Sequence, residues 1–149
     1  MTRLLFAVAL ALAAIGGTSS ATAQATSSSS DRYVVDYYYK TRWGFQEEFI
    51  ELFRRNHWPL LQARVDKGTI VEVTAAAPRY HATEDGRWDY RVTIVFPTVQ
   101  AAHFPTSVSD PDRRRLFPDS VRYQKEEHRR FEILEAHWDV PIVAVAAKP

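Results

Sequence analysis

The feature that most constrains this chain is a change in the spacing of its apolar residues, which occurs twice. Over residues 33–40, β-branched and aromatic residues alternate with others, a period of two that is typical of a strand. From Phe45 the period becomes helical, and over residues 88–96 it returns to two. A second helical segment and a final apolar run follow. The order predicts strand, helix, strand, strand, helix, strand.

Local signals set the limits of these elements. Pro59 lacks an amide hydrogen, so we expect the first helix to kink or restart near His57 and Trp58. Gly68 follows Lys67 and predicts where that helix ends. The remaining expectations are a strand over 69–74, a short helix after Thr98, an irregular stretch over 104–112, a charged helix over 120–136 and a last strand over 138–145.

This order of elements predicts an α+β fold of the ferredoxin-like type, βαββαβ, in which an antiparallel sheet carries its helices on one face. Three stretches resemble the dimeric α/β-barrel superfamily. They are the opening Tyr33-Val-Val-Asp-Tyr-Tyr-Tyr, the helical His57-Trp-Pro-Leu-Leu with Asp66-Lys-Gly68, and Tyr90-Arg-Val-Thr-Ile-Val-Phe-Pro-Thr-Val-Gln-Ala-Ala-His103. The resemblance lies in pattern and order, and it covers most of residues 33–145.

The resemblance implies a homodimer in which two sheets form a barrel across a twofold axis. It also implies a small-molecule pocket between each sheet and its helices. Activities in that superfamily range from cofactor-independent monooxygenases, isomerases and polyketide cyclases to haem-handling enzymes, so the fold alone does not select one. The insertion from Phe104 to about Glu127 is a candidate cover for the pocket.

The N-terminal residues predict an export signal. Arg3 is the only charge before Asp31, and the apolar run over residues 4–15 is too short to span a bilayer. We expect a signal peptide over 1–23, a flexible polar tether over 24–31 and one ferredoxin-like domain over 32–147. Cleavage after Ala23 and cleavage after Ala25 both fit the small-residue pattern. The mature chain is expected to be exported, periplasmic or secreted, with no membrane span.

Composition excludes several classes of protein. The chain has no cysteine, which excludes disulfides, thiolate metal sites, cysteine nucleophiles and iron–sulfur clusters. It has 19 Lys and Arg against 18 Asp and Glu, and this near-neutral balance argues against a nucleic-acid partner. Neither His-x-His nor His-Glu-x-x-His occurs, so no metal site is expected. No cofactor is expected either, and the resemblance keeps haem binding through His103 or His57 as an alternative.

Candidate catalytic residues are histidines, because histidine exchanges protons near neutral pH. His57 is the first choice, because a pocket of this fold lies beside it; His81 and His103 follow. A structural or surface role is the competing interpretation for each of them. Aromatic residues that flank the loop between the middle strands, or that lie beside His57 or on the first strand, are the candidates for ligand binding. These are Trp58, Trp88, Tyr90 and Tyr37.

Three functions remain open at this level. The first is a homodimer that holds a small, partly aromatic ligand and, as a cofactor-independent enzyme of the monooxygenase, isomerase or cyclase type, uses a pocket histidine. The second is a non-catalytic binding or assembly protein of the periplasm, in which the aromatic residues serve the core and the subunit interface. The third is a haem-binding protein.

Overall fold

The computed structural model describes residues 32–103 and 110–143. Its strands form one antiparallel sheet with the order β2-β3-β1-β4. The predicted signal peptide over 1–23 and the predicted tether over 24–31 lie outside the described residues. The strands are β1 (Tyr33–Thr41), β2 (Glu72–Ala76), β3 (Tyr90–Phe96) and β4 (Leu134–Ile142).

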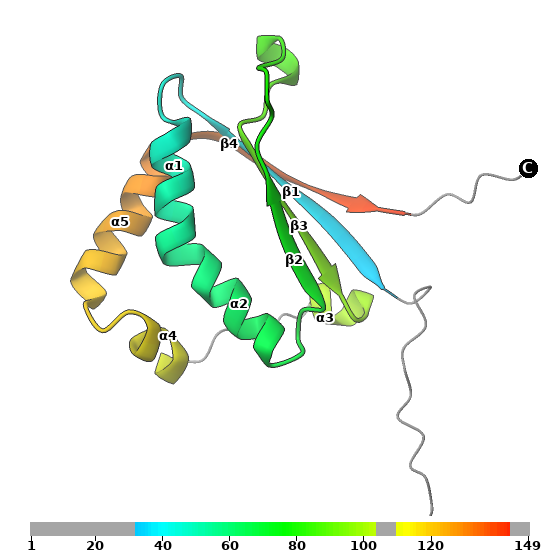
Figure 1. Ribbon diagram of the computed structural model, residues 1–149, viewed down its shortest axis with the longest axis vertical. Helices are drawn as coiled ribbons and strands as arrows, with labels where there is room; N and C mark the ends of the chain where they lie inside the picture. The colour runs from blue at the N-terminus through cyan, green and yellow to red at the C-terminus, as the bar shows by residue number, and fades with distance from the viewer. Residues whose placement is uncertain (1–31, 104–109, 144–149) are drawn as a thin grey trace, which may run out of the picture.

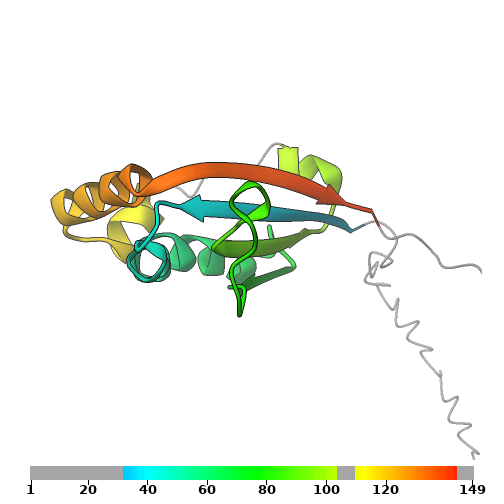
Figure 2. The same cartoon turned by 90° about the horizontal axis from the view of Figure 1, so that it is seen from above.

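Helices α1, α2 and α5 lie on one side of this sheet (Figures 1 and 2). With the sheet order they complete the ferredoxin-like βαββαβ architecture, which confirms the predicted α+β fold. None of the helices in the described ranges is long and apolar enough to cross a membrane. The helical segments are α1 (Gln46–Leu52), the π-helical turn η2 (Phe53–His57), α2 (Trp58–Asp66), the 3-10 turn η3 (Glu84–Gly86), α3 (Val99–His103), α4 (Asp110–Leu116) and α5 (Ser120–Glu132).

The kink expected near Pro59 is the π-helical turn η2, which joins α1 to α2. The amide of Trp58 donates to the carbonyl of Phe53, five residues back. Pro59 offers no amide hydrogen to the carbonyl four residues before it, so the regular α-helical pattern cannot continue there. The wider turn buries Asn56 and brings the ring of His57 to 4.8 Å from that of Phe53. Single π-turns are frequent at functional sites.

The core lies between the sheet and these helices. Every second residue of β3 is buried, as the alternation over 88–96 predicts. On β1, Val35 and Tyr39 point to the same side, since they pair with Ile94 and Tyr90 of β3. The helices contribute buried apolar residues of α1, η2 and α2, namely Phe49, Leu52, Phe53 and Leu61.

Three boundaries differ from the predicted ones, and for β2 and β4 the reason is that backbone hydrogen bonds compete with the local pattern. β2 begins at Glu72 because the amides of Thr69 and Ile70 donate to the carbonyl of Arg64 and complete the end of α2. β4 begins at Leu134 because the residues from there onward pair with β1, so α5 ends before them. In the stretch predicted as irregular, α4 begins at residue 110, and residues 104–109 lie outside the described ranges.

The sheet face opposite α1, α2 and α5 carries exposed apolar side chains. Tyr38 of β1 and Trp138 of β4 are paired across the strands, and their rings stack at 5.5 Å. Trp138, Val140 and Ile142 are 38%, 36% and 42% exposed. Pro141 lies in β4, which is an edge strand of the sheet, where a proline leaves no hydrogen bond of the ladder unmade. We call this surface the open face, defined by Tyr38, Trp138, Val140 and Ile142.

Candidate functional site

A cavity of about 230 Å³ lies between the helix-facing side of the sheet and helices α2 and α5. This is the place where the family resemblance implies a pocket. Its volume is below the roughly 300 Å³ at which pockets for drug-sized molecules begin, so it suits a ligand of about one aromatic ring. We call it the His57 cavity; it is lined by Tyr37, Tyr39, His57, Leu61, Arg64, Val92, Ile94, Arg130, Phe131 and His137.

Helical spacing places part of this lining. His57, Leu61 and Arg64 are four and three residues apart, so they share the face of α2 that meets the sheet. Pro59 is the second residue of α2 and contributes to the shift in register that the π-turn introduces just before this helix. Alternation along β1 places Tyr37 and Tyr39 on the opposite wall.

His57 is neutral at ordinary pH. Burial lowers the pKa of its imidazole to about 4, and the positive charge of Arg130 lowers that pKa further than burial alone would. A neutral imidazole has one ring nitrogen that donates a hydrogen bond and one that accepts a proton. The cavity therefore contains a proton acceptor, the imidazole of His57, whose protonated form is disfavoured as long as no negative charge lies beside it.

This shift makes stability depend on pH. Because the pKa of His57 in the folded chain lies below its ordinary 6.5, the unfolded chain takes up a proton that the folded chain does not. We expect the free energy of unfolding to fall by up to about 3 kcal/mol as the pH falls from 6.5 to 4, and His57 to contribute no further loss below that. Urea unfolding of the wild type and of His57→Gln at pH 7 and 4.5 tests this. The variant should lose less free energy of unfolding between these two pH values than the wild type does. Equal losses in both proteins would contradict it.

The other polar groups of the His57 cavity are held in defined states. Burial raises the pKa of the Tyr37 and Tyr39 hydroxyls, so both remain protonated donors at neutral pH. The ring of His137 stacks on Tyr39 at 4.5 Å, and its Nε2 lies 3.1 Å from Oδ1 of Asp139. The lining thus combines aromatic surface with hydroxyl and imidazole groups, which suits a planar ligand with polar substituents.

Two arginines complete the lining, and they differ in their partners. Arg130 of α5 is buried, and its Nε and Nη2 donate to the two carboxylate oxygens of Glu127 at 3.0 and 2.8 Å. This bidentate pairing neutralises its charge within α5. Arg64 of α2 has no carboxylate partner in the described ranges, although its Nε and Nη2 atoms are buried.

The structure brings together only two of the residues selected from the sequence, His57 and Tyr37. Trp58 and Tyr90 line a different hollow of about 420 Å³ beside β2. The ring of Trp88 packs edge-on against Tyr38, which belongs to the open face.

The other two histidines lie far from the His57 cavity in the fold. His81 lies over the end of the sheet, where it lines a hollow of about 450 Å³ and meets the ring of Trp43 edge-on. His103 is exposed at the end of α3, where its Nδ1 lies 2.9 Å from the carbonyl oxygen of Val99. The three candidate histidines therefore do not form one catalytic group.

The described part of the insertion does not cover the His57 cavity. Residues 116–119 with the first turns of α5 border a separate hollow of about 440 Å³, on the side of η2 that carries Arg55 and Asn56. The remaining part of the insertion, residues 104–109, lies outside the described ranges.

Several lining residues were not selected from the sequence: Tyr39, Arg64, Arg130, Phe131 and His137. Two of them carry a usable signal. Tyr39 follows Tyr37 at strand spacing, and Arg64 follows His57 at helical spacing, so each shares a face with a selected residue. Arg130 carries no such signal, because a charged helix predicts a solvated face and only the packing of α5 shows that this arginine is buried.

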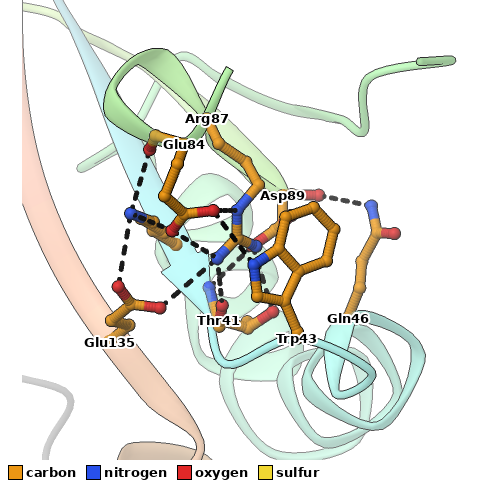
Figure 3. Close-up of polar contacts among 8 residues, drawn as sticks. Thr41, Trp43, Gln46, Glu84, Arg87, Asp89 and Glu135 are labelled. Carbon is orange, nitrogen blue, oxygen red and sulfur yellow. Dashed lines mark hydrogen bonds and ion pairs between the residues drawn. The ribbon is translucent and has the colours of Figure 1, made fainter. Parts of the chain in front are cut away.

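A second polar cluster surrounds Arg87 at the end of the sheet (Figure 3). The Arg87 side chain is 1% exposed; its Nη1 donates to Asp89 Oδ2 at 2.6 Å and its Nη2 to the Thr41 carbonyl at 2.9 Å. The guanidinium lies 4.2 Å from the ring centroid of Trp43. Glu84 and Glu135 approach at 3.4 and 3.3 Å.

This cluster joins segments that are distant in the sequence. Asp89 also accepts hydrogen bonds from the amide and hydroxyl of Thr41, at 2.7 and 3.1 Å, and so ties β1 to the segment before β3. Lys40 donates to Glu84, and this hydrogen bond is the main cause that lowers the pKa of Glu84 to about 2. Since its charges are paired, we assign the Arg87 cluster a structural role. Within the described ranges, no group of three histidine, aspartate or glutamate residues is placed to hold a metal ion.

Neither a protein-family model nor a curated protein sequence matches the chain. Solved structures do resemble it. A hydroxynitrile lyase from Passiflora edulis superposes with a TM-score of 0.50 at 12% identity, over 80% of this chain and 99% of that one. A dimeric ferredoxin-like protein from an uncultured marine organism superposes with a TM-score of 0.50 at 5% identity, over 83% and 96%. The cofactor-independent oxygenase SnoaB from Streptomyces nogalater gives 0.45 at 14%, over 80% and 98%.

The first two likenesses support the ferredoxin-like fold of this chain. At these identities they show nothing about its substrate or its chemistry.

Proposed function

We propose that this protein is an exported homodimer that binds a small, partly aromatic molecule in the His57 cavity. The observation that carries the proposal is the cavity itself, which contains a neutral histidine, two protonated tyrosines and aromatic walls. Export is supported by the N-terminal residues, with their single positive charge, short apolar run and small-residue cleavage sites.

A second copy of the chain is the proposed occupant of the open face. Trp138 and Tyr38 form a stacked aromatic pair there, and Val140 and Ile142 extend the apolar surface along β4. Exposed apolar side chains that gather on one surface mark interaction sites. A twofold axis through this surface lets identical patches bury one another, which is the arrangement that the family resemblance implies.

We propose cofactor-independent proton transfer as the chemistry of the His57 cavity. A ring nitrogen of His57 takes a proton from an acidic O–H or C–H of the ligand, and the electron pair of the broken bond remains on the ligand as an anion. The empty cavity disfavours the imidazolium, but a negative charge formed next to it raises the pKa of His57. The tyrosine hydroxyls are protonated and available to donate hydrogen bonds to that anion. If no bond of the ligand is broken, the protein is a non-catalytic binding protein that holds its ligand in the same cavity.

Haem binding receives no support from this geometry. A cavity of about 230 Å³ fits one ring rather than a tetrapyrrole, so His57 is not placed to hold haem within it. His103 is exposed at the end of α3 and does not line the His57 cavity.

Filling the cavity tests the proposed function. Leu61 is buried in the lining, so Leu61→Phe places extra carbon where a ligand ring would lie. With phenol as the probe, we expect the ring resonances of His57 to shift in NMR spectra of the wild type, and Leu61→Phe to weaken phenol binding about tenfold or more.

His128→Gln is the matched control, because His128 lies exposed on α5, with its Nε2 3.1 Å from Oε1 of Glu132. This variant should bind phenol as the wild type does. Phenol binding that Leu61→Phe leaves unchanged would show that the ligand lies elsewhere.

A further inference from the structure

Two nitrogens of the partly buried Arg64 guanidinium have no hydrogen-bond partner in the described ranges. Its Nε and Nη2 atoms are shielded from solvent and have no hydrogen-bond partner, and no carboxylate of the described ranges pairs with it. Burial lowers the pKa of this guanidinium, with only the nearby Tyr37 opposing that effect. The two other buried arginines, Arg87 and Arg130, each have at least one carboxylate partner.

An unpaired buried cation is costly, because the group loses its hydration and gains no hydrogen bonds in exchange. Such a residue stands out in a chain whose other buried arginines are paired. The unpaired donors also belong to a residue that lines the His57 cavity, so a molecule in that cavity is placed to satisfy them. We propose that Arg64 binds the oxyanion of an acidic ligand, so that the His57 cavity selects small planar acids over neutral molecules of the same shape.

This inference rests on the proposed function and adds the charge of the ligand. The oxyanion is that of a carboxylate or of a phenol or enol that ionises on binding. Arg130 already donates its Nε and Nη2 to Glu127, whereas the Nε and Nη2 of Arg64 have no such acceptor in the described ranges. The guanidinium carbon of Arg64 lies 5.9 Å from the ring centroid of Phe96, a contact that helps to hold it in place.

The positions of Arg64 and His57 on one face of α2 suit a ligand with two polar ends. An acid held by Arg64 at one end lies with its ring against Tyr37 and Phe131. For a phenol or enol, the proton lost to His57 leaves a negative charge that the Arg64 guanidinium then stabilises. No further reactant is needed for this step, because the proton and the electron pair both remain in the complex.

The test compares benzoate with benzamide, which have the same shape and differ in charge, in titrations of the purified protein. We expect the wild type to bind benzoate at least about tenfold more tightly than benzamide, since a hydrogen bond to a charged group is stronger than one to a neutral group. Arg64→Gln should remove this preference, Arg64→Lys should keep part of it, and Arg115→Gln on the exposed side of α4 should leave it unchanged. A titration with 4-nitrophenol, whose absorbance changes when its hydroxyl ionises, distinguishes the two sources of the oxyanion. It shows whether a phenol ionises when it binds, in addition to the carboxylate that benzoate supplies.

A second measurement needs no ligand. Because the cation is unpaired, Arg64→Met should raise the Tm of the ligand-free protein by a few degrees. If benzamide binds the wild type as tightly as benzoate and Leu61→Phe weakens both, the cavity binds ligands but the role of Arg64 is wrong. If both compounds bind and Leu61→Phe affects neither, or if neither binds, the proposed function fails as well. A Tm that falls in Arg64→Met would show that Arg64 is structural and would overturn the inference.

Discussion

Arg87→Met is expected to lower the free energy of unfolding by about 3–5 kcal/mol, the largest effect of any single substitution considered for this chain. Removing the guanidinium leaves the carboxylate of Asp89, which is 9% exposed, as a buried charge without its cation. The variant also loses the hydrogen bond to the carbonyl of Thr41 and the contact with the ring of Trp43. Urea unfolding at pH 7 measures the change.

Arg122→Met provides the matched control, because the Arg122 side chain is 62% exposed and its ion pair with Glu126 lies at the surface. We expect this control to change stability by less than about 1 kcal/mol. A loss below about 1 kcal/mol in Arg87→Met would show that the Arg87 cluster does not hold the end of the sheet together.

Trp138→Glu is expected to convert a dimer into a monomer at micromolar concentration. A large aromatic residue near the centre of an interface often contributes more than about 2 kcal/mol, equivalent to a roughly 30-fold change in Kd. The substitution also places negative charges of the two subunits close together across the twofold axis. Sedimentation velocity between roughly 1 and 100 µM measures the dissociation constant.

Val121→Glu is the control for charge and exposure, since Val121 is 76% exposed on α5 and does not belong to the open face. This variant should remain a dimer. A wild type that sediments as a monomer throughout the concentration range would contradict the proposed homodimer. The proposed small-molecule cavity is tested separately, by the ligand-binding experiments.

The order of elements was predictable because it depends on local periodicity. The alternation in β3 reports a strand with one buried face, and the observed burial follows it residue by residue. Pro59 likewise predicts a break in the first helix, because the missing amide hydrogen is a property of the residue itself. Strand and helix boundaries were less predictable where a distant partner decides them, as the pairing of Leu134 with Thr41 decides the start of β4.

The candidate site was predictable only in part. His57 was selected because the fold places a pocket beside it, and the His57 cavity agrees with that expectation. His81 was selected for the aromatic residues around its loop and His103 from the family resemblance, and the structure places them at separate surfaces. Arg130 was missed because an arginine on a charged helix predicts a solvated side chain. Arg64 was missed although its helical spacing from His57 was a usable signal.

The sequence by itself determined the ferredoxin-like order of strands and helices, since local spacing and a proline carry that information along the chain. Only the tertiary structure decided which charges are compensated. Glu127 pairs with Arg130 within one helix, Asp89 pairs with Arg87 at the end of the sheet, and no carboxylate of the described residues pairs with Arg64. The physical reason is that the cost of a buried charge depends on which groups surround it in space, and spacing along the chain does not report those groups.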